Sequence, residues 1–151
     1  MRVALDTNIL AYAEGVNGAT MRRTALELVD KLPEGAVLLP VQSLGELFNL
    51  LVRKAGRAPA TARKAILSWK DAFPLIETSA EVMLAAADLA TDHHLGIWDS
   101  VILSATAEAG CRLLLSEDLQ EGFTWKGVTV TNPFSTPKNE LLAALLTNSE
   151  S

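Results

Sequence analysis

The chain has 151 residues, a formal net charge of −5 and a hydrophobic content of 49%, which predicts one globular domain with an ordinary apolar core. No apolar run approaches the roughly 18 residues that a membrane-spanning helix needs, so we expect no membrane association. Asp6 interrupts the first apolar run, and Cys111 is the sole cysteine, which excludes an internal disulfide framework. We therefore expect a cytoplasmic protein without a signal peptide.

The charges are unevenly distributed along the chain. Between Glu46 and Asp71 there is no acidic residue, yet this segment holds six of the 13 basic residues. These six are Arg53, Lys54, Arg57, Arg63, Lys64 and Lys70. The segment is either a solvated helical face or a basic arm able to contact phosphate groups. The acidic net charge taken alone argues against a polyanionic partner.

Short apolar runs alternate with segments of helical periodicity. The predicted strands cover residues 3–5, 36–39, 73–77, 111–115 and 128–131. The predicted helices cover residues 9–13, 21–32, 41–55, 59–71, 80–94, 98–109 and 139–146, and residues 147–151 are expected to fray. Thr20 and either Thr78 or Ser79 are candidate helix caps. The alternation predicts an α/β fold with three layers, α/β/α, around a central parallel sheet of four to five strands.

Acidic residues stand where predicted strands end or helices begin. Asp6 ends the first strand, Asp99 opens a helix and Asp118 follows the fourth strand, while Glu46 lies one to two turns into the helix after the second strand. Each acid alone is explained equally well as a helix cap or a solvated carboxylate. In a parallel sheet, however, such junctions share the edge where ligands bind. If the first strand is central with the fourth beside it, the four acids converge there.

Carboxylates gathered in one cleft repel each other. At about 4 Å and an effective dielectric constant near 20, each pair costs on the order of 4 kcal/mol. A fold keeps such a cluster only if protons or cations neutralise it. Oxygen ligands without a Cys or His set suit Mg²⁺ or Mn²⁺, and these ions can activate a water for attack on a phosphodiester. Because the metal would attract a polyanionic substrate, the acidic net charge does not exclude nucleic acid.

The order and spacing of several short motifs resemble those of the PIN domain. The motifs are Leu5-Asp6-Thr7-Asn8, Glu46 early in its helix, Trp98-Asp99-Ser100, Leu115-Ser116-Glu117-Asp118 and the closing Val130-Thr131-Asn132-Pro133-Phe134. The resemblance covers residues 1–134 and leaves residues 135–151 as a C-terminal extension with a short helix. A stand-alone domain of this length is most similar to the VapC-type toxins of bacterial toxin–antitoxin pairs.

The resemblance implies a Mg²⁺- or Mn²⁺-dependent endoribonuclease, often a dimer, that is inhibited by an antitoxin protein. It implies that Asp6 and Asp99 bind metal directly and that Glu46 is the third acid. Asp118 would be the fourth acid, although Glu117 competes with it for this role. Supporting hydrogen bonds would come from Thr7, Asn8 and Ser116.

Two other classes of function stay open. A catalytically silent nucleic-acid- or protein-binding module would use the acids as caps and bind through the basic arm. The RNA-contact candidates in either case are Arg53, Lys54, Arg57, Arg63 and Lys64. A small phosphatase of the haloacid-dehalogenase type would need a second Asp two residues after the first, and this chain has Asn8 there.

Two expectations concern apolar residues. Trp69, Trp98 and Trp125 could stack on bases, but we expect them to pack in the core or at an interface. The apolar residues 83–86 could supply the interface of a homodimer.

Overall fold

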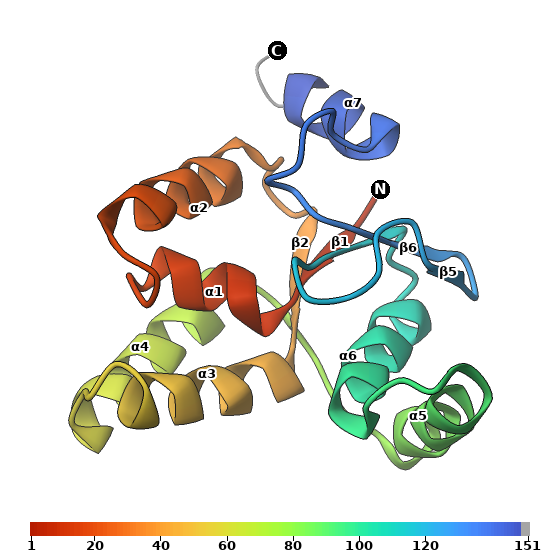
Figure 1. Cartoon of the computed structure of the whole chain (residues 1–151), viewed down its shortest axis with the longest axis horizontal. Helices are drawn as coiled ribbons and strands as arrows, with labels where there is room; N and C mark the ends of the chain where they lie inside the picture. The colour runs from red at the N-terminus through yellow and green to blue at the C-terminus, as the bar shows by residue number, and fades with distance from the viewer. Residues whose placement is uncertain (149–151) are drawn as a thin grey trace.

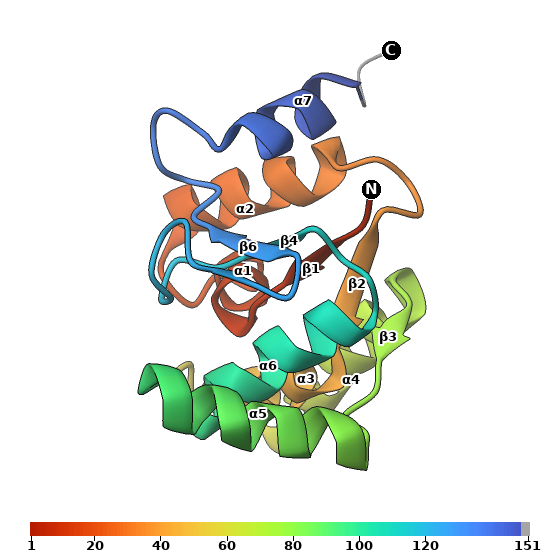
Figure 2. The same ribbon diagram turned by 90° about the vertical axis from the view of Figure 1, so that its right-hand side faces the viewer.

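The computed structural model describes residues 1–148 and contains a six-stranded sheet between two layers of helices (Figures 1 and 2). The strands are β1 (Val3–Leu5), β2 (Val37–Pro40), β3 (Leu75–Ile76), β4 (Leu113–Leu115), β5 (Thr124–Trp125) and β6 (Val128–Thr131). The helices are α1 (Thr7–Ala13), α2 (Ala19–Lys31), α3 (Val41–Arg53), α4 (Pro59–Ala72), α5 (Ala80–His93), α6 (Ile97–Glu108) and α7 (Glu140–Asn148). The α/β fold expected from the sequence is confirmed.

The strand order is β3-β2-β1-β4-β6-β5, and every neighbouring pair is parallel except β5 and β6. The first strand is therefore central and pairs with β4, as convergence of the acids requires. The sequence did not predict β5, which makes the sheet one strand larger and antiparallel at one edge. Lys126 and Gly127 both have positive φ (47° and 84°), and such a pair connects two strands of a tight hairpin.

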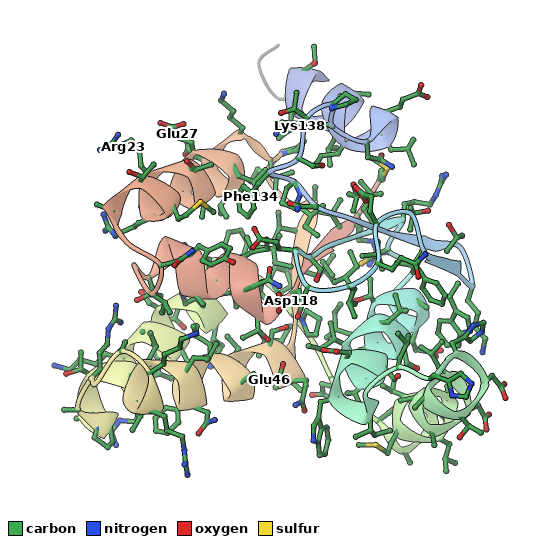
Figure 3. All side chains as sticks on the ribbon, in the orientation of Figure 1. Arg23, Glu27, Glu46, Asp118, Phe134 and Lys138 are labelled. Carbon is green, nitrogen blue, oxygen red and sulfur yellow. The ribbon has the colours of Figure 1, made fainter. Side chains whose placement is uncertain are left out.

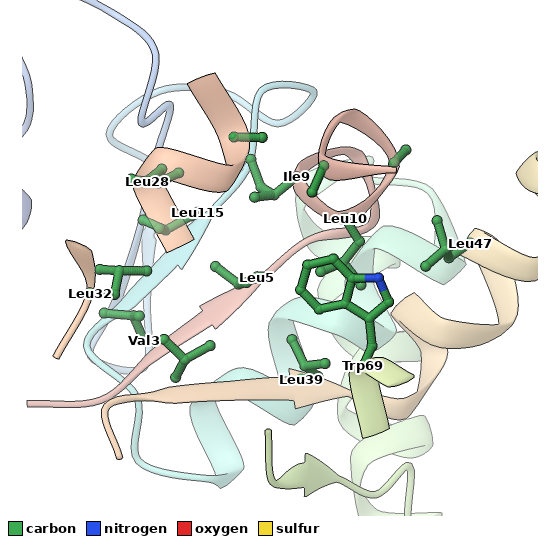
Figure 4. Close-up of a cluster of buried hydrophobic side chains, with 14 of the residues drawn as sticks. Val3, Leu5, Ile9, Leu10, Leu28, Leu32, Leu39, Leu47, Trp69 and Leu115 are labelled. Carbon is green, nitrogen blue, oxygen red and sulfur yellow. The ribbon is translucent and has the colours of Figure 1, made fainter. Parts of the chain in front are cut away.

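Alternate residues of the central strands face two separate apolar clusters. Val3 and Leu5 pack with α1–α4 and α7, whereas Ala4 packs with α5 and α6 on the other face. In Figure 1 α1–α4 lie to the left of β1 and α5 and α6 to its lower right, and Figure 4 shows Val3 and Leu5 within the first cluster. Leu113 and Leu115 join the first cluster and Leu114 the second, because side chains alternate along a strand.

The C-terminal helix belongs to the same packed body. Leu142 and Leu145 of α7 are buried in the first cluster together with Leu28 and Leu32 from α2 and the turn after it. Burying side chains of this size contributes roughly 1.5–3 kcal/mol each. Helix α7 continues through residues 147 and 148, which were expected to fray, and residues 149–151 lie outside the described part of the chain.

Helix boundaries differ from the predicted ones where the caps differ. Helix α1 begins two residues early because the Asp6 side chain accepts a hydrogen bond from Thr7 N (2.7 Å) and caps it. Thr20 is not a cap: α2 begins at Ala19, after Gly18 with φ of 94°. Ser79 caps α5 through Val82 N (3.1 Å). None of the helices in residues 1–148 combines the length and apolarity needed to cross a bilayer.

Candidate active site

A cavity of about 500 Å³ lies where β1 and β4 end, and all four predicted acids line it. Asp6 follows β1, Glu46 lies in the second turn of α3, Asp99 lies in the first turn of α6, and Asp118 follows β4. In Figure 3 the labels of Glu46 and Asp118 lie close to the centre of the molecule, near the ends of α3 and α1. The other lining residues are Thr7, Asn8, Gln42, Gly45, Asn49, Leu50 and Trp98. Asp6 and Asp118, which are 112 positions apart in the sequence, thus line the same cavity.

Asp6 is the most constrained of the four acids, with 4% of its surface exposed. Its Oδ1 accepts the bond from Thr7 N, and its Oδ2 accepts a hydrogen bond from Ser116 Oγ (2.7 Å). Its backbone N–H also donates to Leu115 O (2.9 Å), which continues the pairing of β1 with β4. The Asp6 carboxylate is therefore fixed by a helix start on one side and a strand end on the other.

The surroundings of Asp6 and Asp99 in the cavity oppose ionisation of these two acids. Burial raises the pKa of Asp6 from 3.8 to about 6, even though the hydrogen bonds from Ser116 and Thr7 act to lower it. The charges of Asp99 and Glu46 raise it further. Burial also raises the pKa of Asp99, and the charge of Asp118 adds to this. The acids are close enough to repel one another, and a cation would relieve that repulsion.

Glu46 is tied to the β1 end of the cavity. Thr7 Oγ1 donates a hydrogen bond to Glu46 Oε2 (2.7 Å), a contact across 39 residues. Ser43 Oγ, one turn earlier in α3, donates to Leu5 O (3.2 Å). These two bonds hold the N-terminal half of α3 against the end of β1, so the Glu46 position follows from the packing of α3 on that strand.

The loop after β4 separates the two competing candidates for the fourth acid. Glu117 Oε1 accepts a hydrogen bond from Tyr12 OH (2.7 Å), and Glu117 does not line the cavity. Asp118 does line it, and its backbone N–H donates to Ser116 Oγ (3.3 Å). Asn8 Oδ1 accepts from Glu117 N (3.3 Å), which further fixes the loop. This geometry favours Asp118 over Glu117.

The cavity lacks a built-in cation. None of its lining residues is Lys, Arg or His, and the one ion pair among residues 1–148 joins Arg57 to Glu14 elsewhere. Asn8 lines the cavity with 8% of its surface exposed, and its Nδ2 has no hydrogen-bond partner in the described structure. A buried donor without a partner costs free energy, so Asn8 Nδ2 is available to donate a hydrogen bond to an oxygen atom of a ligand.

The donor chemistry of the cavity fits a hard divalent ion. Carboxylate oxygens are the ligands that Mg²⁺ and Mn²⁺ prefer, and no thiol or imidazole competes with them there. No three His, Cys, Asp or Glu side chains within residues 1–148 are already arranged as a metal site. The cavity therefore supplies suitable oxygens, and binding an ion would require some of these side chains to move closer together.

The basic residues expected to contact RNA lie outside the cavity lining. Arg53 and Lys54 are exposed at the end of α3, and Arg63 and Lys64 are exposed on α4. Arg57 is engaged within the protein: its Nη1 lies 2.8 Å from Glu14 Oε1, and its Nη2 donates to Glu14 O (2.6 Å). This contact leaves the Arg57 guanidinium less free for RNA than the sequence suggested.

Five lining residues were not among the predicted site residues, and three of them, Gln42, Asn49 and Trp98, have polar or aromatic side chains. Gln42 and Asn49 lie at positions i−4 and i+3 from Glu46, so helical spacing places them on the Glu46 side of α3. Trp98 directly precedes Asp99 and is 52% exposed, which shows that it is not part of the core of this chain. Trp69, by contrast, is buried as expected.

Comparison with known families identifies the class of protein. The family profile described as PIN domain matches residues 3–121, and the chain therefore belongs to the PIN-domain family. No curated protein sequence is similar enough to this chain to count as a match.

Solved structures with a similar fold come from toxin–antitoxin systems. VapC20 of Mycobacterium tuberculosis, described as a sarcin–ricin loop cleaving toxin, has a TM-score of 0.65 at 19% identity, over 77% of this chain and 89% of that one. VapBC2 of Rickettsia felis, bound to a promoter DNA fragment, has a TM-score of 0.64 at 19% identity, over 87% and 98%. A toxin–antitoxin complex from Klebsiella pneumoniae has a TM-score of 0.62 at 19% identity, over 84% and 95%. At these identities the likeness shows the shared fold.

Proposed function

We propose that this chain is a Mg²⁺- or Mn²⁺-dependent endoribonuclease and the toxin of a type II toxin–antitoxin pair. The observation that carries the proposal is the shared cavity of Asp6, Glu46, Asp99 and Asp118, which has no basic side chain in its lining. PIN domains are typically metal-dependent nucleases, and the chain belongs to that family. Buried acids that lack an internal cation are suited to bind an external one.

The proposed roles follow from how each acid is held. Asp6 and Asp99 would bind the metal directly, and Glu46 and Asp118 would bind it directly or through water. A bound ion would activate water and stabilise the charge that develops on the phosphodiester, leaving a 3′-hydroxyl and a 5′-phosphate. Ser116 Oγ and Thr7 N orient the Asp6 carboxylate.

Hydrogen bonds from Thr7 and Asn8 keep Glu46 and the Asp118 loop in place. Thr7 Oγ1 holds Glu46, and Asn8 Oδ1 holds the backbone of the loop that carries Asp118. Asn8 Nδ2, which has no partner within residues 1–148, would donate to a phosphate oxygen of the substrate. These contacts match the supporting roles proposed for Thr7, Asn8 and Ser116.

Proposed partners of this chain are an RNA substrate, an antitoxin protein and a second copy of the chain. The similar solved structures include a toxin–antitoxin complex and VapBC bound to DNA. For the homodimer we propose the segment 83–86 of α5, where Leu84 is 69% exposed. A cytoplasmic location likewise stays a prediction.

The test is cleavage of single-stranded RNA by purified protein with Mn²⁺ or Mg²⁺, and in excess EDTA. We expect cleavage with metal, none in EDTA, and recovery when Mn²⁺ is restored. Asp99→Asn should remove activity, and Asp88→Asn, at an exposed acid of α5 outside the cavity, is the matched control. Equal cleavage in EDTA would contradict the proposal. RNA binding without cleavage, unaffected by Asp6→Asn, would instead support the silent binding module.

A further inference from the structure

Trp98 differs from the other tryptophans of the chain in how its ring is used. Trp69 stacks on Phe73 (ring centroids 6.0 Å apart) and donates its Nε1–H to Glu14 (2.9 Å). Trp125 lies beneath Lys126 Nζ, 4.7 Å from the ring centroid. Trp98 has no ring contact or hydrogen bond from its side chain within residues 1–148, and half of its surface is exposed. An indole left in water forgoes the favourable burial that its large area offers.

The position of Trp98 is set by a rigid element. It lies in the first turn of α6, and the residues that follow Asp99 in this helix, Ser100 and Val101, are fully buried. Trp98 is also the one aromatic residue that lines the acid cavity. The helix therefore presents the Trp98 indole to solvent directly beside the acids. The indole is exposed on a well-packed helix and not on a loop.

Two side-chain amides lie at the same cavity on α3. Gln42 and Asn49 line it, and neither side chain makes a hydrogen bond within the described residues. Together with Glu46 and Arg53 they occupy positions 42, 46, 49 and 53, which form one line along the helix. Arg53 lies seven residues beyond Glu46, about 10 Å along the helix axis. The cavity thus continues into a polar track that ends at an exposed cation.

We propose that Trp98 is a platform on which an unpaired base of the RNA substrate stacks, next to the phosphodiester held at the acids. Gln42 and Asn49 face the same strand and contact its base edges or backbone. Aromatic side chains bind single-stranded nucleic acid by stacking on bases, and amides read base edges that duplex pairing would hide. The inference rests on the proposed ribonuclease function and makes unpaired RNA, rather than duplex, the substrate class.

The first experiment separates stacking from simple apolar contact. Single-turnover cleavage of a single-stranded RNA, measured against protein concentration, gives the half-saturating concentration and the maximal rate for each variant. Trp98→Leu keeps apolar bulk without an aromatic face, and Trp98→Phe keeps the face. We expect Trp98→Leu to raise the half-saturating concentration roughly 5- to 100-fold, which is the range for loss of one stacked base. Trp98→Phe should raise it several-fold less, and Trp125→Phe is the control for altering a tryptophan outside the cavity.

The second experiment locates the base. A set of otherwise identical RNAs, each with one abasic position, is bound to wild-type protein and to Trp98→Leu in Ca²⁺, with fluorescence anisotropy as the readout. One abasic position should weaken binding to the wild type by about the factor that Trp98→Leu produces, and weaken binding to Trp98→Leu by less than about twofold. Such non-additivity identifies a direct contact.

The outcomes distinguish this inference from the proposed function. Metal-dependent cleavage with equal half-saturating concentrations for wild type and Trp98→Leu would overturn the stacking role and leave the ribonuclease proposal intact. Equal losses for Trp98→Leu and Trp98→Phe, or additive effects at every abasic position, would also overturn it. A changed sedimentation coefficient of Trp98→Leu with unchanged RNA affinity would assign the exposed indole to a protein interface instead. Absence of any metal-dependent cleavage would defeat the ribonuclease proposal, whatever the binding data show.

Discussion

The two ends of helix α1 carry acids with opposite electrostatic arrangements. At its C-terminal end Glu14 faces a cation and a donor: Arg57 Nη1 lies 2.8 Å from Oε1, and Trp69 Nε1–H donates to Oε2 (2.9 Å). At its N-terminal end Asp6 accepts hydrogen bonds only from neutral groups, Thr7 N and Ser116 Oγ, and repels two neighbouring acids. Both carboxylates are largely removed from water, but only Glu14 has a counter-charge within the fold.

The presence or absence of a counter-charge separates a structural acid from a candidate functional one in this chain. An acid that holds elements together is given its own cation, as Arg57 links the segment between α3 and α4 to the end of α1. An acid that is buried without a cation costs folding free energy, and such groups are concentrated at functional sites. Five predictions test this contrast, in decreasing order of effect.

Asp6→Asn should lower cleavage at least about 100-fold and, at the same time, stabilise the metal-free protein. Loss of a residue that only hydrogen-bonds to a metal-binding side chain costs roughly 10- to 100-fold in metal affinity or activity. Loss of a metal-binding side chain itself should therefore cost no less. The pKa of Asp6 is raised by about two units, which corresponds to about 3 kcal/mol of folding free energy lost when the group ionises. At pH 7 in EDTA the Asn variant should therefore gain up to about 3 kcal/mol.

The sign of the pH dependence follows from the raised pKa of Asp6. Its contribution to wild-type stability is fully present below pH about 4 and is lost as the pH rises through about 6. Urea unfolding in EDTA between pH 4 and 8 should show this decline in the wild type and a flatter profile in Asp6→Asn. An Asn variant that is less stable than the wild type at pH 7 would contradict the contrast.

Divalent metal should stabilise the wild type through the cavity. At a Mn²⁺ concentration about 100 times its Kd, binding adds about 2.7 kcal/mol, which for a chain of this size raises the Tm by roughly 5–10 °C. Differential scanning calorimetry with Mn²⁺ and with EDTA measures the shift. The shift should be lost in Asp99→Asn and retained in Arg57→Met, since only the first change touches the cavity. A Mn²⁺ shift of the same size in Asp99→Asn would place the metal elsewhere.

Arg57→Met should destabilise the protein by about 2 kcal/mol at neutral pH, equally in EDTA and in Mn²⁺. The substitution keeps an apolar stem and leaves Glu14 with Trp69 as its remaining side-chain donor, so a half-buried carboxylate loses its counter-charge. Chemical denaturation under both conditions provides the measurement. If the loss appears only in the presence of metal, Glu14 and Arg57 are coupled to the cavity and the two ends of α1 are not independent.

Asp118→Asn and Glu117→Gln should differ in activity although they are neighbours. Asp118 lines the cavity, whereas Glu117 is held outside its lining by Tyr12 OH. We expect roughly a tenfold loss of cleavage for Asp118→Asn and less than about a threefold change for Glu117→Gln, compared through kcat/KM. The reverse order would show that Glu117 leaves Tyr12 and supplies the fourth acid.

Local signals in the sequence were sufficient for most of the fold. Apolar runs and helical periodicity identified β1, β2, β3, β4 and β6 and each of the seven described helices, because burial on a face imposes those patterns directly. Strand β5 was missed because two residues joined to β6 by a Lys126-Gly127 turn leave almost no periodic signal. The Thr20 cap was wrong because α2 begins at Ala19, two residues earlier than predicted, directly after Gly18 with its positive φ.

The candidate site was only partly visible in the sequence. Asp6 and Asp99 stood out because each lies at a junction between elements, and Glu46 and Asp118 followed once those junctions were placed on one sheet edge. Arg57 was assigned to an RNA-binding arm because charge patterning cannot reveal a partner 43 residues away. Trp98 was expected to pack in the core or at an interface, and its exposure excludes the core. Aromatic character alone does not show which side of a helix faces solvent.

Local sequence accounts for the helices and strands, for their α/β alternation and for the polar residues that end the strands, since all of these depend on neighbours a few residues apart. Long-range packing sets which acids share a cavity, gives Glu14 a cation and Asp6 none, and leaves the Trp98 indole exposed beside the acids. Those properties depend on the pairing of β1 with β4 and on the packing of α3 and α6 at the ends of these strands. The β1–β4 pairs and the hydrogen bonds Thr7–Glu46 and Ser116–Asp6 join residues 39 to 110 positions apart. No local pattern can specify them, because the energy of a charge depends on what surrounds it in space.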